Sequence, residues 1–402
     1  MKLTLRQQLT QFAQVLQSRL FPALQEELGP LTSSAKRLVA TLEMIPLERF
    51  IPSGRGGTGR PAKDRYPIAC GFVAKAVYGF GETRQLLEAL QGDTQLRRIC
   101  GWENAWQVPH ESTFSRAFEE FANMQLPQFV HECLIRETQK DRLIGHIARD
   151  STAIEVREHY PETPGQKAAR KAERKAARKA EKEAAAANRK RGSRGPHKRY
   201  QGGKRPYVPV SDTRLRRQRS MTLSDMLADL PTACDLGGKR NSQGNTQYWR
   251  GYKLHLDVAD GQVPISAVLT SASVHDSQVA IPLATMTTRR VTYLYDVMDS
   301  AYDAYHIREQ CRELGHVPIV DPKAPGGPKK GEAIPLGTPP RQLSWAEEER
   351  YKERTMVERV NARLKDEFGG RQTRVRGPVK VMAHLMFGVL ALTADQILRL
   401  IR

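Results

Sequence analysis

The segment from Ser344 to Gly370, SWAEEERYKERTMVERVNARLKDEFGG, constrains the chain more than any other. Ser344, followed three residues later by Glu347, predicts a capping box at the start of a helix. The pair Gly369-Gly370 predicts the stop. We therefore expect one helix between these signals.

Four side chains that can take part in chemistry share one face of this expected helix: Tyr351, Arg354, Glu358 and Lys365. At about 100° per residue they fall within an arc of about 60° over four turns. The apolar residues lie roughly opposite, between about 140° and 260° from the tyrosine. These are Met356, Val357, Val360, Leu364 and Phe368. The helix can thus pack on a core while it presents one carboxylate, two cations and a phenol, although a solvated, salt-bridged face is the ordinary alternative.

The spacing Tyr-x2-Arg-x3-Glu-x6-Lys resembles the signature of the DDE transposases of bacterial insertion sequences. Upstream segments look like blocks of that family, in its order: HIARDSTAI around Asp150, WRGYKLHLD from Trp249 to Asp257, SVHDSQ around His275-Asp276, and YDVMDSAYD around Asp299. The resemblance covers most of Leu143 to Lys365, apart from one insertion. It implies a ribonuclease-H-like catalytic domain.

The charge balance points to a polyanionic partner. The chain has 64 Lys and Arg against 44 Asp and Glu, a net charge of +20. So large an excess favours nucleic acid over a membrane surface.

Cysteine usage and hydropathy indicate a cytoplasmic protein without a membrane anchor. The five cysteines are odd in number and lack CxxC spacing, so neither a disulfide framework nor a zinc site is expected. The N-terminus MKLTLRQQLTQF has no apolar h-region. The longest apolar run, Val381 to Leu392, is short, contains His384 and predicts a core helix.

Residues 1–140 show helical periodicity and no strand pattern. We predict helices at Leu5–Leu28, Ser33–Leu42, Tyr66–Tyr78, Glu82–Leu90, Ser112–Ala122 with Ser112 as its cap, and Met124–Lys140. This region is either a bundle that supports the rest or a helix-turn-helix reader of the element's ends. In the second case the Gly- and Arg-rich stretch Pro52–Pro61 would be a minor-groove arm.

Residues 141–402 read as an α/β domain, interrupted by a basic insertion at about 160–245. Alternating or apolar runs predict strands at Ile144–Ile154, Tyr252–Val258, Ile265–Thr270, Val291–Met298 and Val317–Val320. Helices are expected at Asp276–Thr287 and Ala304–Leu314. This order suits a mixed sheet flanked by helices.

Within the insertion, Gln166 to Arg205 holds 16 Lys and Arg against three Glu. Its alanine-rich first part has no apolar stripe and therefore nothing to bury. The segment is either a solubilising linker or a non-specific phosphate contact, which its charge density favours.

Asp150, Asp299 and Glu358 are the predicted catalytic and metal-binding residues. Asp150 and Asp299 each come late in or directly after an apolar run that predicts a strand. Cutting a phosphodiester in line is served by two Mg²⁺ ions, which prefer carboxylate oxygens, and Mn²⁺ is expected to substitute. Asp296 and Asp303 compete with Asp299, but the family's Asp-x2-Tyr pattern matches Asp299. Asp276 is a further rival, although the pair His275-Asp276 more simply shapes a turn and caps the next helix.

The resemblance also implies roles for the other side chains on the helix. Arg354 and Lys365 would hold a phosphate, and Tyr351 would bond a phosphate or stack on a sugar or base. Trp249 and Trp345 could stack an unpaired base, although burial in the core is the ordinary fate of a tryptophan. Four cations line the basic approach to the second strand and are candidates for DNA contact: Lys239, Arg240, Arg250 and Lys253.

These features lead us to expect a transposase that acts on double-stranded DNA, at terminal inverted repeats and at a target, as a homodimer. The stretch from Asp299 to Glu358 has no room for the large β-rich insertion of family members that cut through a hairpin. The route of second-strand cleavage therefore stays open. A ribonuclease-H-like nuclease without strand transfer and a non-catalytic basic DNA-binding protein are the alternative functions.

Overall fold

The computed structural model describes residues 5–51, 63–158, 171–173, 175–176, 213–240, 245–322 and 343–400. The chain divides into two units, the first made of Met1–Val156 with Arg214–Arg402 and the second of Arg157–Thr213. All elements below belong to the first unit. The stretch Pro52–Pro61 and most of the basic segment Gln166–Arg205 lie outside the described residues.

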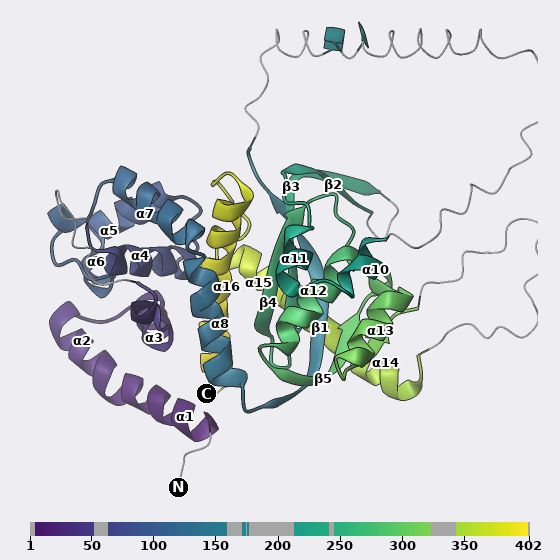
Figure 1. The fold of residues 1–402 in the computed structure, drawn as a ribbon. Coiled ribbons are helices and arrows are strands. Elements are labelled where there is room, and N and C mark those ends of the chain that lie inside the picture. Colours follow the sequence, from purple (N-terminus) through teal and green to yellow (C-terminus); the bar gives the residue numbers. More distant parts are fainter. Residues whose placement is uncertain are drawn as a thin grey trace, which may run out of the picture. The chain divides into compact units, whose positions relative to one another are not determined.

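A six-stranded mixed sheet carries the second half of the first unit (Figure 1). Its strands are β1 (Leu143–Glu155), β2 (Asp235–Arg240), β3 (Thr246–Ala259), β4 (Val263–Ser271), β5 (Thr292–Met298) and β6 (Val317–Val320). Their order is β2-β3-β1-β5-β6, and β4 also pairs with β3. β1 runs antiparallel to β3 and parallel to β5, and β5 runs parallel to β6. All five predicted strands are therefore present, some with longer bounds.

Helices cover the sheet and connect its strands. They are α10 (Arg214–Gln218), α11 (Leu223–Ala228), α12 (Ser277–Thr288), α13 (Tyr305–Glu313), α14 (Trp345–Tyr351), α15 (Thr355–Asp366) and α16 (Pro378–Leu400). α12 packs on β3 and β4, and α15 packs on β1 and β3. The predicted mixed sheet flanked by helices is confirmed, and the arrangement is consistent with a ribonuclease-H-like domain.

The N-terminal region is helical, as predicted. It contains α1 (Leu5–Val15), a π-helical turn (Leu16–Leu20), α2 (Phe21–Leu28), α3 (Ser33–Met44), α4 (Arg65–Val77), α5 (Thr83–Gly92), α6 (Thr94–Ile99), α7 (Glu111–Asn123) and α8 (Leu126–Gln139). The predicted Ser112 cap of α7 is wrong, because the His110 ring accepts the hydrogen bond from Ser112 N instead. α6 was not predicted; Asp93 caps this short helix.

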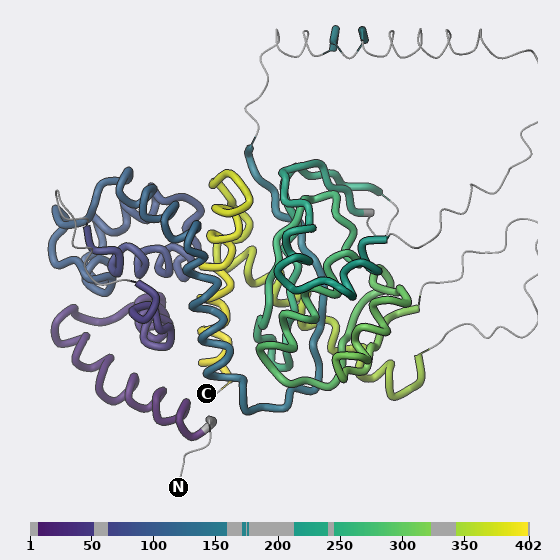
Figure 2. The backbone as a smooth tube through the Cα atoms, viewed as in Figure 1, coloured from purple at the N-terminus to yellow at the C-terminus, as the bar shows by residue number. Residues whose placement is uncertain are grey.

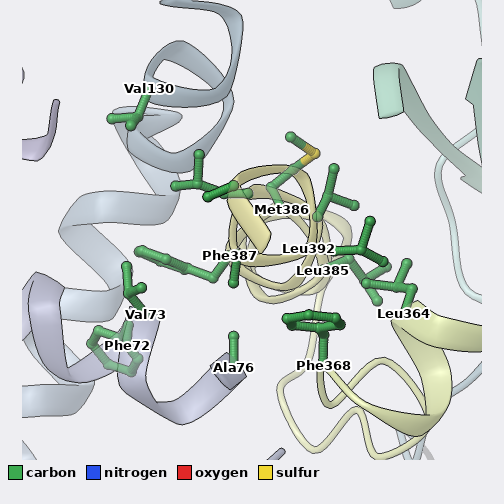
Figure 3. Packing of buried hydrophobic residues seen from close by; sticks show 14 of the residues in the cluster. Phe72, Val73, Ala76, Val130, Leu364, Phe368, Leu385, Met386, Phe387 and Leu392 are labelled. Atoms are coloured by element: carbon green, nitrogen blue, oxygen red, sulfur yellow. The ribbon is translucent and has the colours of Figure 1, made fainter. Parts of the chain in front are cut away.

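Helix α16 joins the N-terminal helices to the sheet. It lies beside α8 (Figure 2) and also contacts α4, α7 and β4. Figure 3 shows Phe387 on the side of Phe72 from α4, while Leu385 lies toward Leu364 from α15. α16 is long and apolar enough to cross a membrane, but 94% of its most apolar window is buried in the protein, so it is the expected core helix. The regions 1–140 and 141–402 share one hydrophobic core.

The expected single helix over Ser344–Gly370 is interrupted. The capping box between Ser344 and Glu347 is present, and α14 starts after it. A 3₁₀ turn at Lys352–Arg354 then separates α14 from α15. Because a 3₁₀ turn advances about 120° per residue instead of about 100°, the geometry of the predicted stripe changes at this point.

Candidate active site

Asp150 and Asp299 occupy matching positions on neighbouring parallel strands. Arg149 of β1 pairs with Met298, the last residue of β5, so Asp150 and Asp299 follow at the same level. Asp299 is the N-cap of the short 3₁₀ turn Ser300–Tyr302 that follows β5, and its carboxylate accepts a hydrogen bond from Ala301 N at 2.9 Å. The strand pairing thus brings these two predicted residues to the same level, at the carboxyl end of β5.

The environment of these carboxylates disfavours their charged forms. Burial raises the pKa of Asp150 to about 6, and the carboxylates of Asp299 and Asp276 add to the rise. Burial also raises the pKa of Asp299, again with a contribution from Asp276. Lys239 acts in the opposite direction on both. Three like charges therefore interact here, an arrangement that a bound cation would relieve.

Glu358 projects from α15, whose apolar side packs on β1 and β3. Its Oε1 accepts a hydrogen bond from Arg354 Nη2 at 2.6 Å, an i,i+4 ion pair of the kind that helical spacing favours. Arg354 is in turn close enough to Asp150 and Asp299 to interact with both charges. Across the described residues, no three His, Cys, Asp or Glu side chains approach closely enough to hold one metal ion. Glu358 is thus linked to the two aspartates through Arg354.

The rival aspartates on β5 and after it have other partners. Asp296 is completely buried and accepts a hydrogen bond from Arg149 Nη2 at 3.0 Å. Asp303 forms an ion pair with Arg308 Nε at 3.0 Å. Asp299 directly follows β5, at the level of Asp150, so the geometry favours Asp299 over both.

The pair His275-Asp276 caps α12, but through its histidine, because Ser277 N donates to His275 Nδ1 at 3.3 Å. Asp276 stands at the N-cap position of α12 and makes no capping hydrogen bond with its side chain. Its Oδ1 instead accepts a hydrogen bond from Lys253 Nζ at 3.0 Å. Burial acts to raise the pKa of Asp276, but His255, Lys253 and Ser151 together lower it. The motif SVHDSQ marked this segment, but only the folded sheet shows that Asp276 lies beside Asp150 and Asp299.

The predicted DNA-binding residues lie before, in and after the 3₁₀ turn: Tyr351 ends α14, Arg354 ends the turn, and Lys365 is in α15. The Arg354 guanidinium lies 5.8 Å from the centre of the Tyr351 ring. Burial, followed by the charges of Arg371 and Lys239, lowers the pKa of Lys365. Lys365 therefore has other cations near it, and an anion would stabilise its charged form.

The tryptophans divide between the two fates considered. Trp249 is buried, as expected, and its Nε1 donates to Tyr252 O at 3.1 Å. Trp345 is 77% exposed, so the expectation of a core position is wrong for it. It is the first residue of α14, where the chain enters a helix whose residues are all at least partly exposed.

Two parts of the chain match known transposase families. Residues 212–394 match the family described as Transposase DDE domain, and residues 26–120 match the family described as Transposase domain (DUF772). Asp299 and Glu358 lie inside the first match, whereas Asp150 precedes it. No curated protein and no solved structure matches the chain. Together, the two domain matches support a transposase of the DDE type.

Proposed function

We propose that the chain is a transposase that binds the ends of its insertion sequence, cuts the DNA there and joins the freed 3′-OH ends to target DNA. The observation that carries this proposal is the pairing of β1 with β5, which puts Asp150 and Asp299 at one level. Glu358 and Arg354 lie on the adjoining helical segment that packs against these strands. A double-stranded DNA substrate also fits the net charge of +20.

Asp150, Asp299 and Glu358 would hold two Mg²⁺ ions, with Mn²⁺ as a substitute. The chemistry of the donors fits, because carboxylate oxygens are the ligands that Mg²⁺ prefers, and binding would require the three side chains to come closer together than they lie here. When bound, such a pair of ions activates water and neutralises the phosphate charge. Glu358 would exchange its Arg354 partner for the ions, and the 49% exposure of its side chain leaves room for that exchange.

Arg354, Lys365 and Tyr351 would hold the DNA. A guanidinium released from Glu358 offers two parallel donors to a phosphate. Lys365 lies near Lys239 and Arg371, and a phosphate would offset that repulsion. Tyr351, next to Arg354, could bond the same phosphate or stack on a sugar. These residues keep the reacting strand in place for a second reaction.

Substitution of each acidic residue tests the proposal. We expect Asp150→Ala, Asp299→Ala and Glu358→Ala each to lower Mg²⁺-dependent cleavage of a plasmid that carries the gene and its flanking DNA by at least about 100-fold, because a metal ligand is lost. DNA binding, measured by fluorescence anisotropy without metal, should stay within about twofold.

Asp303→Asn is the matched control, since it removes an aspartate of the same segment that pairs with Arg308. It should cut like the wild type. Robust cleavage by any of the three alanine variants would remove that residue from the site.

A further inference from the structure

The strands β2 and β3 form a two-stranded ribbon that continues beyond the end of β1. Residues Asp235–Arg240 pair with Thr246–Gly251, whereas β1 ends at Glu155, opposite Gly251. We call these two segments the β2–β3 ribbon. The sequence pattern does not predict β2, so the ribbon is a feature that only the structure shows.

The base of the ribbon is fixed to the rest of the fold. Trp249 is buried on one face, over Gly237, where an added Cβ would come within 2.6 Å of the indole ring. At the start of β2, the Asp235 carboxylate accepts a hydrogen bond from Ser273 N at 3.0 Å. These contacts hold the ribbon in a defined position.

The opposite face of the ribbon presents an aromatic ring and a cation to solvent. Tyr248 is 70% exposed and pairs across the strands with Gly238, which has no side chain to cover the ring. Two residues along, Arg250 projects from the same face. Within the described part of the chain, Arg250 has no ion-pair partner. An exposed ring beside an uncompensated cation suits the π-face of a base and its phosphate.

The ribbon is also close to the candidate active site. Lys239 of β2 pairs with Gln247 and therefore lies on the face of Gly237 and Trp249, and its charge acts on the pKa of Asp150, of Asp299 and of Lys365. No ion pair of Lys239 is found among the residues described. A DNA strand at the carboxylates would therefore meet this cation next.

We propose that the β2–β3 ribbon is a DNA-contact surface on which Tyr248 stacks an unpaired base near the cut end. Arg250, on the same face as Tyr248, would hold a flanking phosphate, and Lys239, on the other face, would contact the strand where it reaches the carboxylates. This proposal rests on the proposed function, because it needs DNA at the acidic residues. A base presents its face to a side chain only when it leaves the duplex stack, so the preferred substrate is a DNA end with unpaired nucleotides.

The test compares two oligonucleotides of the same sequence, one fully paired and one with a short unpaired end. Binding is measured by fluorescence anisotropy without metal. Tyr248→Ala should weaken binding to the unpaired end by about 5- to 150-fold, the range of base stacking on aromatic side chains, and binding to the paired duplex by less than about twofold. Tyr248→Phe should bind like the wild type, because it keeps the ring.

Tyr305→Ala is the matched control, since Tyr305 is 69% exposed on α13 and outside the ribbon. It should change neither affinity. Arg250→Ala should weaken binding to both oligonucleotides and reduce the slope of log K against log salt by about one phosphate contact.

Equal affinities of Tyr248→Ala and wild type for the unpaired end would overturn the inference, and so would equal losses on both oligonucleotides. The proposed function fails separately, if the wild type binds the oligonucleotides but cuts no DNA in Mg²⁺. Melting temperatures of the variants show whether the fold is intact, which the exposure of Tyr248 leads us to expect.

Discussion

At the scale of single residues, the local sequence predicted the position of a side chain where that position depends only on its place along a strand. Asp150 and Asp299 follow apolar runs, and the pairing of β1 with β5 brings them to one level. The closeness of Asp276 and Lys239 to Asp150 could not be predicted in the same way, because it depends on how distant segments fold together. The expected burial of Trp345 was wrong for a related reason, because composition does not show which end of a helix faces solvent.

The raised pKa of Asp150 predicts a pH-dependent stability difference. Because folding favours the protonated carboxyl group, Asp150 contributes stability below pH 3.8 that is lost as the pH rises through about 6. Without metal, Asp150→Asn should therefore gain stability relative to the wild type over this range, by up to about 3 kcal/mol.

The comparison must be a difference between the two proteins at each pH, measured by urea unfolding. Burial lowers the pKa of His131, His255 and His384 to about 3, 4 and 3, and this destabilises both proteins alike on acidification. A difference that does not change between pH 4 and 7 would show that Asp150 titrates normally.

At the scale of elements, periodicity predicted the long helices and the buried strands, and it failed for short or glycine-rich pieces. β2 reads DLGGKR, which has little strand propensity, and its pairing with β3 supplies what its own sequence lacks. The 3₁₀ turn at Lys352–Arg354 leaves no mark in the apolar pattern, because that pattern begins after it at Met356. Tertiary packing decides such details.

The packing of α16 on α15 gives an element-scale prediction. A Cβ at Gly388 would lie 2.9 Å from Leu364 Cδ1 and 2.9 Å from Phe368 O. Gly388→Val should destabilise the protein by about 1–3 kcal/mol through overpacking, and it should also lower cleavage, because α15 carries Glu358. Thermal unfolding and plasmid cleavage measure the two effects.

Gly92→Ala is the control for this substitution. Gly92 ends α5, and an added Cβ there would have nothing within 4 Å. The free energy of unfolding of Gly92→Ala should therefore be unchanged or slightly higher than that of the wild type. If Gly388→Val were as stable as this control, the contact between the two helices would be looser than the structure indicates.

At the scale of the whole molecule, the chain combines one compact unit with a strongly basic segment. The N-terminal helices and the sheet share a core through α16, which contacts both. The segment Gln166–Arg205, with 16 Lys and Arg against three Glu, falls within the second unit, Arg157–Thr213. The sequence predicts this basic insertion by composition, with an extent of about 160–245, and Arg214–Gln218 within that range forms α10 of the first unit.

Deleting residues 167–191 should weaken binding to all DNA sequences alike and flatten the salt dependence of binding, since phosphate contacts are lost. The melting temperature should stay the same, because the deletion lies outside the first unit. Binding is measured on several unrelated duplexes over a salt series. A selective loss on the terminal repeats would identify the segment as a sequence reader instead.

Strand transfer is the measurement that tests the central claim most directly. The substrate is a duplex of the inverted repeat that flanks the gene, already cut to leave a free 3′-OH, with a plasmid as target and Mg²⁺ present. We predict that the wild type joins the two DNAs, that Glu358→Gln does not, and that Arg354→Ala and Lys365→Ala lose joining more than cutting. A wild type that cuts intact ends but never joins pre-cut ones would contradict the account and identify a nuclease.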